Sequence, residues 1–520
     1  MNTHLERRTL LRAGAATGAG LLLGAGAAAC GADSAHTAAS SALIGPTDPA
    51  VAAVESARYH SGATRTFTLD AVPGKIDLGG VVVSTWTYGG VLPGAEIRVN
   101  RGDLINAHLV NHLPEETTVH WHGVAIRNNM DGVPQLTQSP VAPGASRTYT
   151  FTAANPGTYW LHPHVGVQQD RGLYAPLIVD DPGEKADYDH EWTVVLDDWI
   201  DGTGHTPDQV LAALQNTPAP TASASGMDTG MGMGSGSTAG GGDGVVLMDA
   251  TSPLLGGDAG DVRYPYFLIN GRLRTDPATF TARPGQRTRI RIINAGSDTA
   301  FRVALGGHTL TVTHTDGYPV VPVETTSLLL GMGERYDVEV TLGDGVFPLV
   351  ASAEGKNATA LAVVRTASGR APSPDVRPAE LAADPIGYGA LQPTEPYRLK
   401  PAASQVAANL RLTVSKTSYT WTINDTVYNP ERPLMRVESG QRVRLTWTNT
   451  TTMWHPMHLH GHTFQLAGGG PRKDTVIVLP GRSVTVEFDA DNPGQWMMHC
   501  HDTYHASTGM MGVIGYQTKA

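Results

Sequence analysis

Residues 499–510 read HCHDTYHASTGM, and this stretch can supply metal ligands from both faces of one strand. In an extended strand successive side chains point to opposite faces, so the two histidines of HCH share one side and the Cys500 sulfur projects from the other. A thiolate, two imidazoles and a weakly bound thioether form the trigonal site of a blue copper protein. Cys500, His505 and Met510 supply three of these four groups, so one imidazole must come from another part of the chain.

The missing imidazole is found in HPMHLHG at residues 455–461, which holds one isolated histidine and one His-x-His pair. We assign the isolated His455 to the site of Cys500. One His-x-His pair alone would indicate ordinary surface or core histidines, but four pairs together with a cysteine and a methionine make coincidence negligible. The paired histidines are His120, His122, His162, His164, His458, His460, His499 and His501.

The first and last thirds of the chain repeat one spacing of glycines and histidines, which indicates an internal duplication. Gly102 precedes the first histidine of the next pair by 18 residues, and Gly440 does the same in the last third. The same interval recurs for Gly144 and Gly481. Counting the interval from Gly285 in the middle third reaches an apolar run instead. The middle copy therefore keeps the framework and lacks the ligands.

Each third predicts β-structure. Residues 288–292 and 442–447 alternate with period two, and turns rich in Pro and Gly separate such runs. With 60 Gly and 35 Pro among 520 residues, long amphipathic helices are hard to find. We predict an all-β protein of three consecutive β-sandwiches. Ligands from the first and last thirds can form one cluster only if those domains pack together, so we expect the cluster at their interface.

The four histidine segments, in this order and spacing, resemble the copper motifs of three-domain, laccase-like multicopper oxidases. The resemblance covers nearly the whole exported chain and implies three cupredoxin-like Greek-key domains. It also implies four copper ions, of which one is type 1, one is type 2 and two form a type 3 pair. His120 and His458 would hold type 2 copper. The type 3 ligands would be His122, His162, His164, His460, His499 and His501.

The resemblance assigns type 1 copper to His455, Cys500 and His505, with Met510 as the axial ligand. Met511 is a possible substitute for Met510. A substrate would give single electrons to type 1 copper through an imidazole edge, and the cluster would reduce O2 to water. Because Cys500 is bonded through the backbone to the histidines on either side, electrons would have a short covalent route between the two sites.

Reduction of O2 to water needs protons, and Asp131 is our candidate relay. It lies nine residues after His122, at the position of the acidic group that the family carries near its cluster. A turn-forming aspartate before glycine is the alternative interpretation of Asp131. Asp502 is a weaker candidate. Some relatives carry an acid directly after the second type 1 histidine, where this chain has Ala506.

A methionine as axial ligand, an export signal and a loop rich in Gly and Met together resemble actinobacterial copper-resistance oxidases. These enzymes convert Cu(I) to Cu(II) and also oxidise phenols. A laccase acting on phenolic or other organic substrates shares every ligand and is the alternative. A non-catalytic exported protein of the same fold is an alternative from another class. The net charge of −11 argues against nucleic acid as a partner, and we expect a monomer.

Arg7-Arg8 and the apolar run after them predict a twin-arginine export signal and an extracytoplasmic protein. Cys30 follows three alanines, so the protein is either anchored as a lipoprotein or cleaved and secreted. Residues 217–244 contain Met227, Met231 and Met233, which would be Cu(I) ligands or part of a plain linker. The predicted segments are a signal at 1–29, linkers at 30–58 and 368–402, and domains at 59–185, 186–367 and 403–520.

Overall fold

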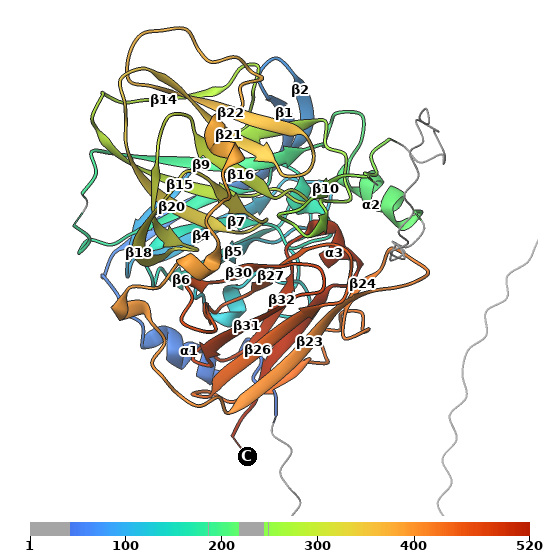
Figure 1. Ribbon diagram of the computed structural model, residues 1–520. Coiled ribbons are helices and arrows are strands. Elements are labelled where there is room, and N and C mark those ends of the chain that lie inside the picture. The colour runs from blue at the N-terminus through green and yellow to red at the C-terminus, as the bar shows by residue number, and fades with distance from the viewer. Residues whose placement is uncertain (1–41, 186, 218–243, 248, 520) are drawn as a thin grey trace, which may run out of the picture. The chain divides into compact units, whose positions relative to one another are not determined.

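The structure is a computed structural model that describes residues 42–185, 187–217, 244–247 and 249–519. The expected export signal, Cys30 and nearly all of the Gly/Met segment 217–244 lie outside these residues. The described chain is built mainly from strands, arranged as three cupredoxin-like β-sandwiches in succession (Figure 1). The predicted all-β fold class is therefore confirmed.

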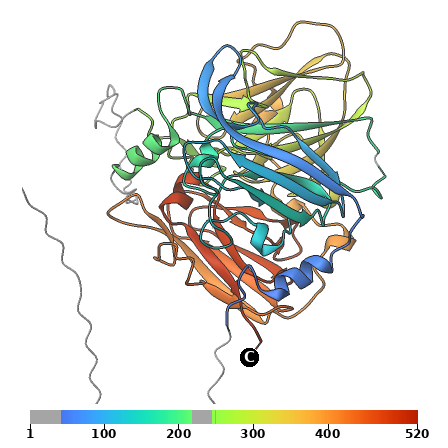
Figure 2. The same ribbon diagram turned by 180° about the vertical axis from the view of Figure 1, so that it is seen from behind.

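The first sandwich pairs two four-stranded sheets. Its strand β4 alternates buried and half-exposed residues, as expected for a strand with one face on the core. One sheet has the order β2 (Val82–Tyr88), β1 (Thr64–Asp77), β4 (Leu104–Asn111), β6 (Ser146–Thr152). The other has the order β3 (Ile97–Asn100), β8 (Ala175–Asp180), β7 (Gly157–His162), β5 (His120–His122). Figure 2 shows the long strand β1, in blue, from the opposite side.

The middle sandwich contains the largest described sheet and carries none of the histidine pairs. Its seven-stranded sheet has the order β13 (Arg272–Leu273), β12 (Tyr266–Ile269), β9 (His190–Trp199), β15 (Arg287–Asn294), β20 (Arg335–Thr341), β17 (Leu310–Thr315), β18 (Tyr318–Thr325). Its five-stranded sheet has the order β14 (Ala278–Thr281), β22 (Ala358–Arg365), β21 (Val346–Ala353), β16 (Phe301–Leu305), β19 (Leu328–Leu330). A short hairpin joins β10 (Thr251–Ser252) and β11 (Gly257–Asp258).

The third sandwich repeats the plan of the first. One sheet has the order β24 (Trp421–Ile423), β23 (Val406–Val414), β26 (Arg442–Asn449), β31 (Ser483–Asp489), β28 (Phe464–Leu466), β29 (Arg472–Lys473). The other has the order β25 (Met435–Val437), β33 (Met511–Tyr516), β32 (Gln495–Cys500), β27 (His455–Leu459), β30 (Thr475–Val478). Every residue of β27 and β32 is buried, so both faces of these strands are covered.

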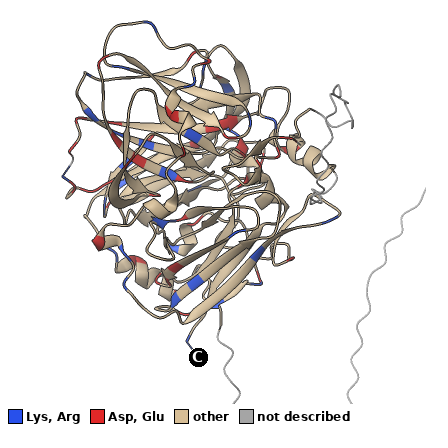
Figure 3. Cartoon of the chain, viewed as in Figure 1, with Lys and Arg blue, Asp and Glu red and all other residues tan. Residues whose placement is uncertain are grey.

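The described residues also form three short α-helices: α1 (Pro49–Ser56), α2 (Pro207–Gln215) and α3 (Thr503–Thr508). Helix α2 begins with a capping box between Thr206 and Gln209. Among the described helices, none combines the length and the apolar character that a membrane crossing requires. Figure 3 shows Lys and Arg interspersed with Asp and Glu over the chain.

Candidate metal centre

The two copies of the domain present their histidines through the same strand pairing. In the first domain β5 pairs with β7, and His120 lies opposite His162. In the third domain β27 pairs with β32, and His458 lies opposite His499. The internal repeat of the sequence is thus a repeat of structure, in which the first histidine of one motif lies opposite the first histidine of another across a ladder.

The eight paired histidines come together in one buried region that both domains build. Three groups of three have their ring nitrogens within 4.8 Å of one another. Each group mixes residues from the first and the third domain, as the sequence predicts for a shared cluster. The groups are His120, His122 and His458; His122, His162 and His501; and His164, His460 and His499.

The ring orientations leave nitrogen atoms free to bind metal. The Nδ1 atoms of His120, His162 and His458 each lie 2.9 Å from a backbone carbonyl oxygen, so each must donate its proton there. The Nε2 atoms of the same three rings are buried and have no hydrogen-bond partner among the described residues. Buried polar atoms normally have a hydrogen-bond partner, so these unpaired nitrogens need another explanation. Metal binding provides one, because an imidazole that donates from Nδ1 can bind a cation through Nε2.

Burial also sets the charge of these rings. It lowers the pKa of His162 well below the ordinary value, and the neighbouring His120 ring adds to the effect. Burial likewise lowers the pKa of His460 and of His499, and adjacent histidines lower both further. His162, His460 and His499 are therefore neutral at pH 7, which is the protonation state that a metal ligand requires.

A second group of ligand atoms surrounds Cys500 on the other face of β32. The Cys500 sulfur lies 3.6 Å from Nδ1 of His455 and 3.6 Å from Nδ1 of His505, and these two nitrogens are 3.2 Å apart. The opposite ring nitrogens are held by hydrogen bonds, at 2.8 Å to Thr451 and at 3.1 Å to Asp261. These bonds turn both Nδ1 atoms towards the sulfur, so two imidazoles and a thiol form a trigonal set.

The surroundings of Cys500 also favour a bound cation. Burial raises the pKa of the Cys500 thiol well above its usual value, and Asp502 raises it further. A thiolate at this position therefore needs a compensating positive charge, which a bound metal ion provides. Asp502 itself caps helix α3, where its carboxylate accepts from the backbone N–H groups of Tyr504 and His505. That capping bond places His505 over the sulfur.

The two adjacent methionines occupy different surroundings. Met510 is fully buried, and its carbonyl oxygen accepts from the Cys500 N–H at 3.0 Å. Met511 is half-buried and lines a cavity of about 220 Å³ together with His164 and His499. The same cavity is lined by Ala506 of α3 and Leu211 of α2. It lies directly against the histidine cluster, whose half-buried member is His164.

Asp131, the candidate proton relay, lies beside histidines of the cluster. Its backbone oxygen accepts from Nδ1 of His120 at 2.9 Å, and its carboxylate lies 3.0 Å from Nδ1 of His460. Asp131 is fully buried and contacts one histidine of the first domain and one of the third. Asp502, the weaker relay candidate, instead contacts the helix that carries His505.

Asp474 is a site residue that sequence reasoning missed. Its backbone oxygen accepts from Nδ1 of His458 at 2.9 Å, and its carboxylate lies 3.1 Å from Nε2 of His122. It therefore repeats the contacts of Asp131 from the other domain. The internal repeat is only a weak guide to Asp474, because the spacing differs between the two copies. Asp131 follows His120 by 11 residues, whereas Asp474 follows His458 by 16.

Comparisons with known proteins agree with this geometry. Three segments, residues 72–184, 190–369 and 401–519, match family models that are each described as multicopper oxidase. The chain is 48% identical to "Multicopper oxidase MmcO" of Mycobacterium tuberculosis, with 96% of this chain and 95% of that protein covered.

More distant relatives carry two kinds of name. The chain is 29% identical to "Laccase-2" of Botryotinia fuckeliana, with 87% of this chain and 82% of that protein covered. It is 27% identical to "Copper resistance protein A homolog" of Pseudomonas syringae pv. tomato, with 84% and 90% covered. A solved multi-copper oxidase from Pseudomonas thermotolerans superimposes with a TM-score of 0.65 at 27% identity, covering 88% of this chain and 100% of that one.

Proposed function

The chain belongs to the multicopper oxidase family, and from this premise we propose that it couples one-electron oxidation of a reductant to the reduction of O2 to water. The main support for this proposal is that strand β32 contributes side chains to both candidate metal sites. Cys500 contacts His455 and His505 on one face, while His499 on the same strand joins the histidine cluster on the other. Covalent bonds of the backbone thus connect an electron-accepting site to a site able to reduce O2.

We propose four copper ions per chain. His455, Cys500, His505 and Met510 would hold type 1 copper, and His120 and His458 would hold type 2. The type 3 pair would be held by His122, His162, His164, His460, His499 and His501. When bound, these ions supply one-electron transfer at the first site and multi-electron transfer to O2 at the cluster. The unpaired Nε2 atoms of His120, His162 and His458 support this assignment.

Asp131 is the proposed proton relay. Its carboxylate contacts His460 and His120, and among the described residues its ion-pair contacts are with these two histidines alone. A carboxylate without a Lys or Arg partner is free to take up a proton and release it towards the cluster. The cavity beside His164 would admit O2 and release water.

The charge beside the Cys500 site favours a cationic reductant. Both His455 and His505 are fully buried, and the group that reaches towards solvent from His505 is the Asp261 carboxylate. Asp261 is 13% exposed and accepts a 2.6 Å hydrogen bond from the Tyr419 hydroxyl. A negative group at the electron entry point attracts Cu(I) more strongly than it attracts a neutral phenol.

We therefore propose Cu(I) oxidation in copper resistance as the main activity, with phenols as secondary substrates. The relative named a copper resistance protein A homolog supports this substrate, and the relative named a laccase supports the alternative of a phenol oxidase. Oxygen uptake by the copper-loaded protein, with Cu(I) and dimethoxyphenol in parallel, separates the two. Faster uptake with Cu(I) is the expected result, and faster uptake with the phenol would assign the protein to the laccases. No uptake with either, at full copper loading, would favour the non-catalytic alternative.

Export by the twin-arginine route, a monomeric state and lipidation or cleavage at Cys30 also remain proposals. The mass of the mature protein distinguishes an acylated cysteine from a plain amino terminus. Sedimentation of the same sample measures the oligomeric state.

A further inference from the structure

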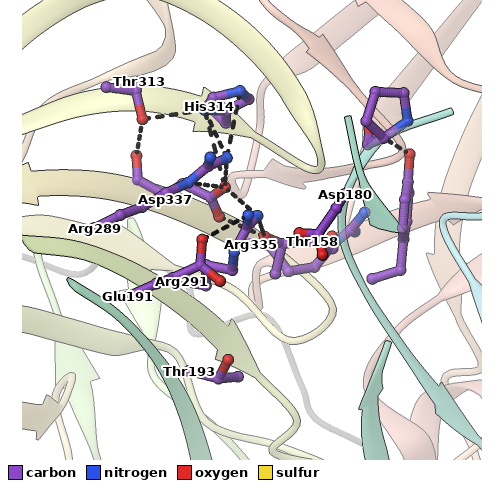
Figure 4. Close-up of polar contacts among 12 residues, drawn as sticks. Thr158, Asp180, Glu191, Thr193, Arg289, Arg291, Thr313, His314, Arg335 and Asp337 are labelled. Carbon is purple, nitrogen blue, oxygen red and sulfur yellow. Dashed lines mark hydrogen bonds and ion pairs between the residues drawn. The ribbon is translucent and has the colours of Figure 1, made fainter. Parts of the chain in front are cut away.

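The middle sandwich lacks copper ligands, yet one of its side chains reaches the histidine cluster. Arg335, the first residue of β20, is fully buried. Its NH1 and NH2 groups donate to the two carboxylate oxygens of Asp474, each at 2.7 Å. Its Nε donates to the backbone oxygen of Thr158 in β7 at 3.0 Å. Arg335 therefore links the middle domain to both ligand-bearing domains, and Figure 4 shows it beside Thr158.

Asp474 transmits this contact to a proposed ligand. The Asp474 oxygen that accepts from Arg335 NH1 also lies 3.1 Å from Nε2 of His122. With Nε2 held in this way, the other ring nitrogen of His122 faces inward, where Nδ1 lies 3.1 Å from Nε2 of His501. His122 is thus turned the opposite way from His120, His162 and His458, whose Nε2 atoms face the cluster.

We propose that Arg335 is a positioning residue for the copper cluster: it locks Asp474 so that His122 presents Nδ1, rather than Nε2, to the metal. The inference rests on the ligand assignment proposed above. A guanidinium suits the task because its planar fork matches both oxygens of a carboxylate, and a lysine ammonium cannot hold that geometry.

The charges of Arg335 and Asp474 support this positioning role. Both carboxylate oxygens of Asp474 accept from the Arg335 guanidinium, which always carries a positive charge, so the buried pair is neutral overall when the carboxyl group is ionised. Asp474 is therefore an anion that accepts hydrogen bonds and donates none. An anionic acceptor fixes the tautomer of His122, because the ring must carry its proton on Nε2.

The backbone before Arg335 is also fitted to the cluster. A Cβ atom on Gly333 would lie 2.8 Å from Cδ2 of His501 and 2.9 Å from Cε1 of His122, and Gly333 has a φ of +85°. The segment thus passes against two proposed ligands at a distance that only glycine allows.

The test compares Arg335→Lys with the wild type in copper content, the blue thiolate band and the near-ultraviolet band of the type 3 pair. We expect the blue band to be unchanged, because the Cys500 site has no contact with Arg335. We expect the near-ultraviolet band to be lost and the affinity for cluster copper to fall by ~10- to 100-fold, as for other partners of metal ligands. An unchanged near-ultraviolet band and full copper would overturn the proposal, as would parallel loss of both bands.

Arg289→Lys is the matched control. Arg289 is equally buried on the neighbouring strand β15 and pairs with Asp337, but it does not contact Asp474. Its variant should keep both bands. Should Arg335→Lys not fold, Arg335→Met combined with Asp474→Asn removes both charges together and avoids a lone buried ion. This double variant should keep the blue band and lose the near-ultraviolet band, and retention of both would contradict the proposal. A wild type without either band would instead refute the proposed function.

Discussion

Asp131 in the first domain and Asp474 in the third hold the histidine cluster from its two flanks. Each accepts a 2.9 Å hydrogen bond from the first histidine of its own domain through its backbone oxygen. Each also extends its carboxylate to a histidine of the other domain, at 3.0 Å and 3.1 Å. The two flanks are thus equivalent in the scaffold that they provide.

The flanks differ in charge balance. Arg335 neutralises Asp474 with two hydrogen bonds, whereas the ion-pair contacts of Asp131 among the described residues are with histidines. A carboxylate that is paired with Arg can orient a ring but cannot carry protons. A carboxylate without such a partner can do both. We therefore propose different roles for the two carboxylates: Asp474 orients its histidines, and Asp131 carries protons to the cluster.

The largest effect is expected at the locked flank. Asp474→Asn removes the anion and leaves the Arg335 guanidinium buried without a charge partner, which should lower the free energy of unfolding by ~3–5 kcal/mol. Urea unfolding of the copper-free protein measures this loss. Asp425→Asn is the control, because Asp425 pairs with Arg411 at the surface and its loss should cost ~0–1 kcal/mol. Equal losses in the two variants would refute the special role of the buried pair.

The same pair predicts how stability depends on pH. The folded-state pKa of Asp474 is held below its ordinary value of 3.8, so its stabilising contribution is fully present above about pH 4 and is lost as the pH falls further. The difference in unfolding free energy between wild type and Asp474→Asn should therefore shrink below about pH 4. A difference that stays constant down to pH 2 would contradict the ionised state of Asp474.

At the unlocked flank the expected effect is on rate. Asp131→Asn keeps a hydrogen-bonding side chain of the same shape, so copper loading and stability should stay near wild type. The loss of a proton carrier should slow O2 uptake by ~100-fold at saturating reductant. Asp131→Glu, which restores the carboxyl group, should recover part of the rate. Normal turnover in Asp131→Asn would remove Asp131 from the proton path.

A third carboxylate, outside the cluster, should have the smallest effect. Asp261→Asn removes a charge from the hydrogen bond to His505, and we expect kcat/KM for Cu(I) to fall by ~10-fold. The value for dimethoxyphenol should change less, because a neutral substrate does not depend on that charge. Copper content should be unaffected. A larger loss with the phenol than with Cu(I) would favour the laccase alternative.

The sequence predicts the parts of this site that depend on local spacing. The His-x-His motifs and the HCH run lie on strands or at strand ends, so period-two alternation is enough to assign their faces, and the glycine spacing reveals the repeat. Asp474 and Arg335 could not be predicted in this way. They lie 139 residues apart in the sequence, so no local spacing connects them. The middle domain, which carries Arg335, has no histidine motif that would indicate a role in the site.

We propose that Cys500 joins an electron-accepting copper to the histidine cluster shared by two domains. Copper content and the absorption spectrum of wild type and Cys500→Ser test it most directly. We expect an intense blue band in the wild type, its complete loss in Cys500→Ser, and a near-ultraviolet cluster band that survives in the variant. A blue band that persists in Cys500→Ser would contradict the assignment of Cys500 as a copper ligand.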